Sequence, residues 1–402
     1  MKLQSEICVV GNGAIGKAAA LALALAGFDV VLLQPASPLT RHSVPDGSWD
    51  LRVYALNHIA RTLLSSLKVW EAMDAARIAP VEAMHICGDA PDHPGRLAFD
   101  AYGARVDGLA WIVEDQNLNG ALDAALQFAP GLRVVTATAL HMQVTTERAT
   151  ILLDSGAQLD SALVVGADGA QSWVRGQADI GLDYRSYNQR AVVTNFSCEK
   201  PHHGVASQWF LGADGVVALL PLPENRVSLV WSAPDALAEV LMAEPVDKLC
   251  LRLGALPGQT LGHLAPLSPP SCQAYPLRLM RAHASVAHRV VLLGDAAHVV
   301  HPLAGQGMNL GFADVLAILA VLARRENKAD CGDMGTLGRY ARARKEDIML
   351  MQIATDGLQR LFASELAPVR ALRNAGLGLV NQLPFLKRRL IAHALGKSSS
   401  LF

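Results

Sequence analysis

The chain has 402 residues, of which 51% are hydrophobic and 18% are charged, and its formal net charge is −1. The charged share is below the roughly 25% of an ordinary globular protein, and a near-zero net charge argues against a nucleic-acid-binding protein. Lys17 and Asp314 interrupt the two longest apolar runs before they reach the roughly 18 residues that a membrane span needs. We therefore expect two or three folding units and no integral membrane protein.

The first 33 residues predict a β-strand, an α-helix and a second β-strand, at residues 6–10, 14–26 and 29–33. Helices are then predicted at 55–64 and 118–128, and short strands at 133–135, 140–144, 150–153 and 162–166. The middle third has strands at 191–196, 208–211, 216–220 and 227–231 that prolines interrupt, which indicates an inserted, mostly antiparallel sheet. A buried strand at 289–293 precedes helices from about 305 to 396.

The N-terminal segment and the cysteines both favour a cytoplasmic protein. The N-terminus lacks the basic segment, apolar core and small-residue cleavage site of a signal peptide. The six cysteines show no C-x-x-C spacing, so we expect buried, reduced thiols and no metal site.

A glycine-rich turn joins the first strand to the first helix. Gly11, Gly13 and Gly16 have the G-x-G-x-x-G spacing, with Ala14 and Ile15 between the last two glycines. Such glycines permit a tight turn and close approach to a pyrophosphate, and the helix N-terminus supplies amide donors and partial positive charge. The strand-turn-helix context therefore predicts a nucleotide-binding site.

Gln34 stands where an acidic residue would be expected to bind a ribose hydroxyl pair. An amide still forms a hydrogen bond with a hydroxyl, but without the charge that strengthens it. Two interpretations are open at this position. Either the contact with the adenosine is weakened or formed in another way, or Gln34 is a neutral substitute and other residues make up for the missing acid.

A second long pattern follows the strand at 289–293. It begins with Gly294, Asp295 and His298 and continues through Pro302 to a glycine-rich helix start at residues 305–311. A carboxylate at a strand end is able to accept hydrogen bonds from a polyol chain, and the helix start presents backbone N–H groups to an electron-rich ring. The two patterns together resemble the two FAD fingerprints of the single-component aromatic-ring hydroxylases, which have the p-hydroxybenzoate hydroxylase fold.

Three further segments extend this resemblance over essentially the whole chain. Residues 166–175, which contain Asp168 and Gly169, resemble the Asp-Gly motif of that class. Residues 50–56, which contain Arg52, and the stretch 361–396 are similar to segments of one subfamily, the ubiquinone-biosynthesis hydroxylases. Gln34 departs from the pattern, which puts FAD affinity in doubt and leaves the fold expectation unchanged.

The resemblance implies an α/β protein with a Rossmann-like FAD-binding domain of the glutathione-reductase type, an inserted antiparallel substrate domain and C-terminal helices. The FAD-binding domain would comprise residues 1–75, 111–180 and 281–330. The substrate domain would comprise 76–110 and 181–280, and the helical region 331–402. Implied cofactor-binding residues are Gly11, Gly13, Ala14, Ile15, Gly16, Gln34, Arg52, Gln116, Asp168, Gly169, Gly294, Asp295, Pro302, Gly305, Gly307, Met308 and Asn309.

The activity implied by the resemblance is hydroxylation of an aromatic ring of a polyprenylated phenol in ubiquinone biosynthesis. NAD(P)H would reduce the FAD, and O2 would then form a flavin C4a-hydroperoxide that the phenolic ring attacks. Two alternatives stay open. The substrate is a soluble phenol or secondary metabolite, or the chain is an attenuated FAD-binding subunit of a biosynthetic complex, which Gln34 suggests.

Candidate side chains for the chemistry are few. His301, Pro302 and Tyr54 are the catalytic candidates, since a histidine with a near-neutral pKa is able to carry a proton and Pro302 would line the ring pocket. His298 is interpreted as a structural hydrogen-bonding residue. The substrate pocket is predicted to include Trp209, Leu219, Leu220 and Pro221, although such a stripe is by default ordinary core.

The C-terminal 46 residues differ in charge from the rest of the chain. Seven Lys or Arg and one Glu give residues 357–402 a net charge of +6, which leaves −7 for the remaining 356 residues. Leucines recur at helical spacing in the same segment. The segment either rests on anionic lipid at the inner face of the plasma membrane or on a partner of a ubiquinone-biosynthesis complex, or its apolar stripe packs on the FAD-binding domain.

Overall fold

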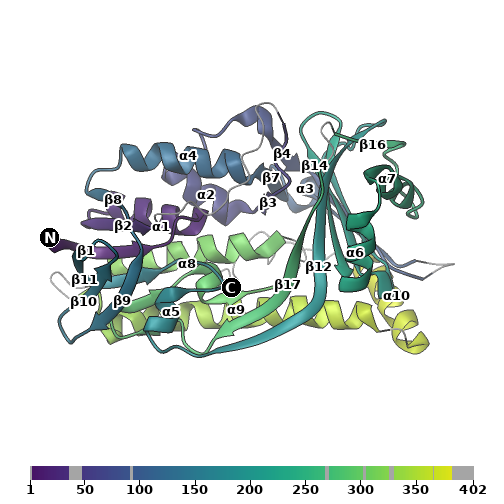
Figure 1. Cartoon of the computed structure of the whole chain (residues 1–402). Helices are drawn as coiled ribbons and strands as arrows, with labels where there is room; N and C mark the ends of the chain where they lie inside the picture. The colour runs from purple at the N-terminus through teal and green to yellow at the C-terminus, as the bar shows by residue number, and fades with distance from the viewer. Residues whose placement is uncertain are drawn as a thin grey trace.

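The computed structural model describes residues 2–35, 48–90, 94–267, 271–301, 305–325, 330–364 and 366–382. Two large sheets lie side by side, and helices cover both (Figure 1). In this view the first sheet and its helices lie at the left, near the N-terminus label, and the second sheet lies at the right. The long strand β12 of the second sheet runs from below the first sheet up to the right. A small third sheet lies between the helical layer and the second sheet.

The first sheet has eight strands, and its centre is parallel, in the order β19-β11-β1-β2-β8. Its strands are β1 (Lys2–Val10), β2 (Val30–Gln34), β8 (Leu132–Thr136), β9 (Ala139–Val144), β10 (Ala149–Leu153), β11 (Gln158–Gly166), β18 (Val286–Ala287) and β19 (Val290–Leu292). Buried side chains of β1 alternate between two cores: Ile7 and Val9 face one, and Cys8 and Val10 face the other. This alternation is the strand period of two, and it buries both faces of the sheet.

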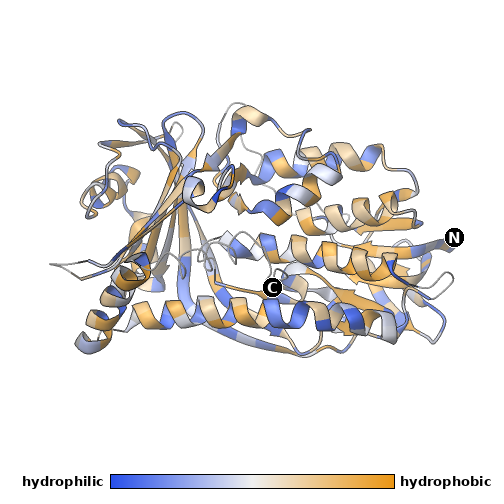
Figure 2. Ribbon diagram, turned by 180° about the vertical axis from the view of Figure 1, so that it is seen from behind, coloured by the Kyte–Doolittle hydropathy of each residue, from blue (hydrophilic) through white to orange (hydrophobic). Residues whose placement is uncertain are grey.

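Helix α1 (Ala14–Leu25) packs on this sheet through small side chains. Ten of its twelve residues are buried, most of them alanines, so the helix lies close to its neighbours. The same side holds α2 (His58–Ser66), α4 (Asp115–Gln127) and α8 (Gln306–Ala323), and α5 (Trp173–Gln177) packs against β9, β11 and β19. Figure 2 shows the strands of this sheet as strongly hydrophobic ribbons between the helices.

The second sheet has nine strands and is antiparallel except where β13 pairs with β5. Its strands are β5 (Ala83–Cys87), β6 (Arg96–Asp100), β12 (Leu182–Cys198), β13 (Val205–Phe210), β14 (Val216–Leu222), β15 (Arg226–Pro234), β16 (Leu264–Pro266), β17 (Gln273–Ala282) and β20 (His298–Val299). One face packs on α6 (Asp235–Ala243) and α7 (Val246–Gly254), which completes a separate core. The other face looks toward the first sheet and lines a cavity.

The remaining elements connect these layers. The third sheet pairs β3 (Val53–Leu56) and β4 (Ile78–Val81) with β7 (Ala110–Glu114). Short helices are α3 (Ala101–Ala104), η1 (Ala75–Arg77), η2 (Gly212–Asp214) and η3 (Gly294–Ala296). The C-terminal part described is α9 (Met334–Ala363) followed by α10 (Ala367–Gln382), which packs on β6.

Most of the predicted elements are present, with two corrections. The helix expected at residues 55–64 is present as α2 but begins only at His58, because residues 55 and 56 end strand β3 and Asn57 caps the helix by accepting a hydrogen bond from the Ala60 N–H. Helices α6 and α7 were not predicted. Pro234 was expected only to interrupt the strands, but it lies directly before the start of α6, as Pro245 does before α7. The expected helical region beyond residue 382 lies outside the described residues.

Helix α8 contains the fully buried carboxylate of Asp314. Asp314 Oδ1 accepts a hydrogen bond from Arg344 Nε at 2.7 Å, and Oδ2 accepts from His298 Nε2 at 2.7 Å and from the Gly294 N–H at 2.9 Å. Burial alone would raise the pKa of this carboxyl, but His298 and Arg344 hold it below its usual value. The cluster therefore joins α8, α9 and the turn after β19 through one charged group.

Within the described part of the chain, α8 is also the one helix long and apolar enough to cross a membrane. It packs against α1, α2 and α9 and places Asp314 in the protein interior. These contacts are those of a core helix.

Replacing Asp314 with Asn tests the cluster. The amide would leave the Arg344 guanidinium buried without its main counter-charge, and breaking a buried ion pair costs about 3–5 kcal/mol. We expect urea denaturation of Asp314→Asn to show a loss of that size in the free energy of unfolding. Asp347→Asn is the matched control, because Asp347 binds the same guanidinium at 2.8 Å from a half-exposed position, where an ion pair contributes about 1 kcal/mol or less. Equal losses would contradict the assignment.

Candidate active site

A cavity of about 2050 Å³ lies between the two large sheets. Ordinary ligand pockets measure about 300–1,000 Å³, so this one has room for a cofactor and a long substrate together. Fourteen of the seventeen residues implied for cofactor binding line it. The exceptions are Gly16 and Gln34, which do not line it, and Pro302, which lies outside the described residues.

The turn between β1 and α1 requires its glycines. Gly11 has φ +128°, and a Cβ there would lie 2.3 Å from the carbonyl oxygen of Ala167. A Cβ at Gly16 would lie 2.5 Å from the Gly11 carbonyl oxygen, so this glycine serves helix packing and not ligand contact. Gly13 is the N-cap of α1, makes no side-chain cap and has open space where its Cβ would be. The helix therefore presents its first N–H groups to the cavity, as binding of a pyrophosphate requires.

A second helix start faces the same cavity. Gly305, with φ +64°, is the N-cap of α8 and likewise has no side-chain cap, and Gly307 has open space beside it. Asn309 fixes this start to β3: its Oδ1 accepts from the Asn57 N–H and its Nδ2 donates to the Ala55 carbonyl, both at 2.9 Å. Two uncapped helix N-termini on one cavity fit an elongated cofactor with a phosphate group and an electron-rich ring, as FAD has.

Two aspartates of the fingerprints behave differently. Asp295 faces the cavity, and its enclosed surroundings raise the pKa of its carboxyl despite the nearby His298 and Arg52. Asp168 uses its carboxylate within its own turn, where it accepts hydrogen bonds from the Ser172 hydroxyl and from the Val174 N–H. Asp168 therefore shapes the turn, whereas Asp295 is available to hydroxyl groups of a ligand.

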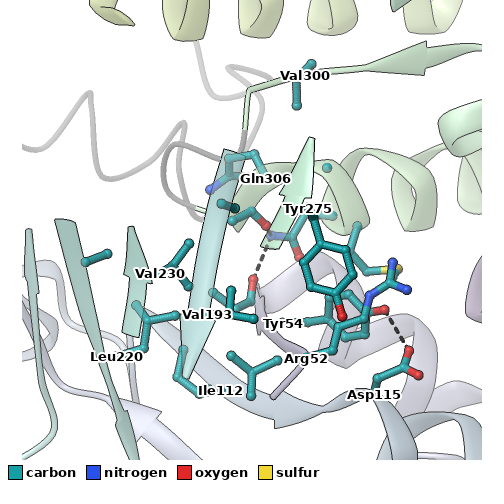
Figure 3. Close-up of a pocket in the computed structure, with 18 of the residues that line it drawn as sticks. Arg52, Tyr54, Ile112, Asp115, Val193, Leu220, Val230, Tyr275, Val300 and Gln306 are labelled. Atoms are coloured by element: carbon teal, nitrogen blue, oxygen red, sulfur yellow. Dashed lines mark hydrogen bonds between the residues drawn. The ribbon is translucent and has the colours of Figure 1, made fainter. Parts of the chain in front are cut away.

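Arg52 and Tyr54 project into the cavity from β3 and the turn before it (Figure 3). The Tyr54 hydroxyl donates to Asp115 Oδ1 at 2.7 Å, and the Arg52 guanidinium lies 5.6 Å from the centre of the Tyr54 ring. Burial raises the pKa of the Tyr54 phenol well above its usual value, so Tyr54 is neutral and acts as a hydrogen-bond donor. Asp115 and Tyr275 also line the cavity beside Arg52 (Figure 3). Sequence reasoning missed Asp115 and Tyr275.

Asp50 positions this group. Its Oδ1 accepts from the Arg52 N–H at 2.9 Å and its Oδ2 from the Gln116 N–H at 3.1 Å. The carbonyl of Asp50 also accepts from the Asn195 amide at 2.9 Å, which ties the segment to β12. Asp50 therefore holds the backbone of Gln116, a residue expected near the cofactor, at the cavity wall.

Gln34 is not a lining residue. Its amide Nε2 donates to Thr136 Oγ1 at 3.1 Å, across the pair of strands β2 and β8. The neighbouring Pro35 lines the cavity instead. This arrangement favours the interpretation of Gln34 as a neutral substitute, and an adenosine contact of its side chain stays a prediction.

The histidines differ from each other. His298 binds Asp314, in agreement with its structural interpretation. His301 is fully buried and does not line the cavity. Its Nε2 lies 3.3 Å from Gln189 Oε1, and its ring packs edge-on against the Tyr187 ring. Burial lowers the pKa of its imidazole to about 4, so the near-neutral value expected of a proton carrier was wrong. A catalytic role for Tyr54 stays a prediction, and Pro302 lies outside the described residues.

Strand alternation corrects the expected substrate pocket. Of the four residues predicted, Leu220 alone lines the cavity. Trp209 and Leu219 belong to the core under α6 and α7, where the Trp209 indole donates to the Pro257 carbonyl at 3.0 Å, and Pro221 is buried on that same strand face. The cavity wall around Leu220 is instead formed by Ile112, Val193 and Val230 (Figure 3).

Comparison with known proteins agrees with these features. Residues 4–350 match the family described as FAD binding domain. The ubiquinone hydroxylase UbiL of Rhodospirillum rubrum is 34% identical over 401 residues, which cover 98% of this chain and 90% of that protein. The 3-demethoxyubiquinol 3-hydroxylase of Escherichia coli is 33% identical over 394 residues, which cover 98% of each.

Solved structures show the same fold. The p-nitrophenol 4-monooxygenase PnpA of Pseudomonas putida superposes with a TM-score of 0.76 at 18% identity, over 98% of both chains. PqsL of Pseudomonas aeruginosa also gives 0.76, at 21% identity, over 93% of this chain and 99% of that one. With its two glycine-bordered helix starts on one cavity, the chain belongs to the FAD-binding family and, within it, to the FAD-dependent hydroxylases related to those of ubiquinone biosynthesis.

Proposed function

We propose that this protein hydroxylates an aromatic ring of a polyprenylated phenol in ubiquinone biosynthesis, with FAD as its cofactor and NAD(P)H and O2 as co-substrates. The observation that carries the proposal is the continuity of one cavity from the two helix N-termini onto the apolar face of the second sheet. Relatives at 33–34% identity over nearly the full chain are named as hydroxylases of ubiquinone or its precursor, which supports the same substrate class.

FAD, when bound, would carry electrons from NAD(P)H and activate O2, and the chain's own residues would bind and enclose it. The N–H groups at Gly13 would face the pyrophosphate, and Asp295 would accept hydrogen bonds from hydroxyl groups. The N-terminus of α8, an 18-residue helix, would stabilise negative charge on the reduced ring without reorganisation. Leu220, Val193 and neighbouring apolar side chains would exclude water from the reacting atoms.

A soluble phenol fits this cavity less well. The part of the wall around Leu220, Ile112 and Val230 is apolar, and Arg226, a lining cation of the same sheet, is already paired with Glu224. A site for a small ionic substrate would need a charged partner within the apolar part. The proposal therefore keeps the prenylated phenol as the substrate class.

Paired substrates test the proposed activity. We expect the FAD-loaded protein to oxidise NAD(P)H faster with a phenol carrying a prenyl tail than with the same phenol lacking it. The ratio of kcat/KM should be about tenfold or more, because each buried methylene contributes about 0.8 kcal/mol. The measurement is NAD(P)H oxidation together with mass spectrometry of the hydroxylated product. Loaded protein that hydroxylates only the tail-free phenol would refute the substrate class.

Substitution of Gln34 tests the idea of an attenuated FAD-binding subunit. If Gln34 contacted ribose, Gln34→Glu would tighten FAD binding about fivefold, because a charge-assisted hydrogen bond gains about 1 kcal/mol over a neutral one. Since the Gln34 amide binds Thr136, we expect the FAD dissociation constant, measured by flavin fluorescence, to stay within about twofold. Asp295→Asn is the comparison variant and should weaken binding. A fivefold gain in Gln34→Glu would restore the attenuated interpretation.

We further propose that the protein is cytoplasmic and rests at the inner face of the membrane through α9 and α10. Of the leucines expected in an apolar stripe, Leu358, Leu361, Leu366 and Leu372 are exposed, which argues against packing of the whole stripe as core. Apolar and hydrophilic residues alternate along both helices in Figure 2. The net charge of +6 over residues 357–402 favours anionic lipid, although Arg373 is buried and paired with Asp89.

Vesicle sedimentation tests this contact. We expect the protein to bind phosphatidylglycerol-containing vesicles and to bind phosphatidylcholine vesicles several times more weakly, with the difference reduced by salt. Leu372→Asn should reduce binding severalfold. Leu251→Asn on α7 is the matched control, because both leucines are 72% exposed. Equal binding by the two variants would refute this surface and favour a protein partner.

A further inference from the structure

The cavity continues past the ring pocket along the inner face of the second sheet. On β14, Leu220, Ala218 and Val216 all line it, because alternate residues of a strand point to the same face. At a rise of about 3.3 Å per residue, Val216 lies about 13 Å along the strand from Leu220. In Figure 3 Leu220 lies near Ile112 and Val193, and Arg52 and Tyr54 lie on the other side of these two residues. We call the region between Leu220 and Val216 the distal arm.

Two stacked aromatic rings line the distal arm at the level of Val216, and the cavity lining also includes Leu97 and Phe99 of β6. Phe210 of β13 and Phe362 of α9 have ring centres 3.6 Å apart with 17° between their planes, and both side chains are buried. With Val216, Ile86 and Leu377 they form a small apolar cluster separate from the other cores. All five residues also line the cavity. The cluster is therefore the wall of a ligand cavity and not the centre of a domain.

Arg373 of α10 fixes the position of Phe362. The Arg373 guanidinium lies 5.3 Å from the centre of the Phe362 ring and forms a buried ion pair with Asp89, in the segment that follows β5. It also donates hydrogen bonds to the carbonyl groups of Leu361 and Ser364, at the break between α9 and α10. This wall is thus assembled from three distant segments that fix the position of one ring.

We propose that the Phe210–Phe362 pair is the stop of the distal arm and sets how much of the substrate's prenyl tail lies inside the protein. The inference rests on the proposed function and deepens it by assigning residues to tail length. A flexible isoprenoid chain gains by burying apolar area, and on this proposal the gain along β14 ends at the stacked rings. Leu358 of α9 lines the cavity and is also partly exposed. The part of the prenyl tail that does not fit inside the distal arm would therefore pass out of the protein between α9 and the second sheet.

Phenols that share one ring and differ in the number of isoprene units test the stop. For the wild type we expect kcat/KM to rise with tail length and then to level off. In Phe362→Ala the plateau of kcat/KM should move to a longer tail. The ratio of kcat/KM at the plateau to kcat/KM with the shortest tail should be about tenfold larger than in the wild type, since one added methylene in an apolar pocket is worth at least that factor. Phe362→Trp should move the plateau to a shorter tail.

Ile353→Ala is the matched control, because Ile353 lies on the same helix α9, is exposed and does not line the cavity. Its plateau should coincide with that of the wild type. Phe210→Leu provides a second test of the same wall if Phe362→Ala does not fold with full FAD content. An unchanged plateau in every folded Phe variant would overturn the stop while leaving the proposed function intact. A wild type that hydroxylates none of the prenylated phenols would overturn both.

Discussion

The buried carboxylate of Asp314 is the constraint on which the site depends. A charge in a protein interior is tolerated only when it is neutralised and fully hydrogen-bonded, and His298, Arg344 and the Gly294 N–H meet that requirement. These partners come from strand β20, from the long helix α9 and from the turn that carries Asp295. One carboxylate therefore fixes α8, whose N-terminus faces the cavity, relative to the turn that carries Asp295.

The two sheets have separate tasks at this cavity. The parallel sheet brings backbone N–H groups to one edge through glycine-bordered helix starts, because the carboxyl ends of parallel strands share an edge. The antiparallel sheet contributes side chains, and its period of two decides which of them face a ligand. Leu219 packs under α6 and α7, whereas its neighbour Leu220 faces the cavity. A shift of one residue in the pairing of β14 would exchange these roles.

The sequence was sufficient where the signal is local. The glycine spacing around Gly11, the strand-helix-strand opening and the later Gly305 turn each lie within a few residues, and their backbone geometry follows from residue type. Choices between strand faces were not predictable, so Trp209 was placed in the pocket although it packs in a core. The hydrogen bond between Tyr54 and Asp115 joins residues 61 positions apart, and no pattern in either segment indicates it.

The order of strands in the parallel sheet has a consequence for synthesis of the chain. Strand β1 leaves the ribosome before the other strands of its sheet, yet its neighbour β11 ends at Gly166 and the next strand, β19, ends only at Leu292. At about 5–20 residues per second, the nascent chain spends on the order of tens of seconds with this apolar sheet incomplete. Pairings so distant in sequence also form slowly. The newly made protein thus has a prolonged period of aggregation risk, during which binding by chaperones would be of most benefit.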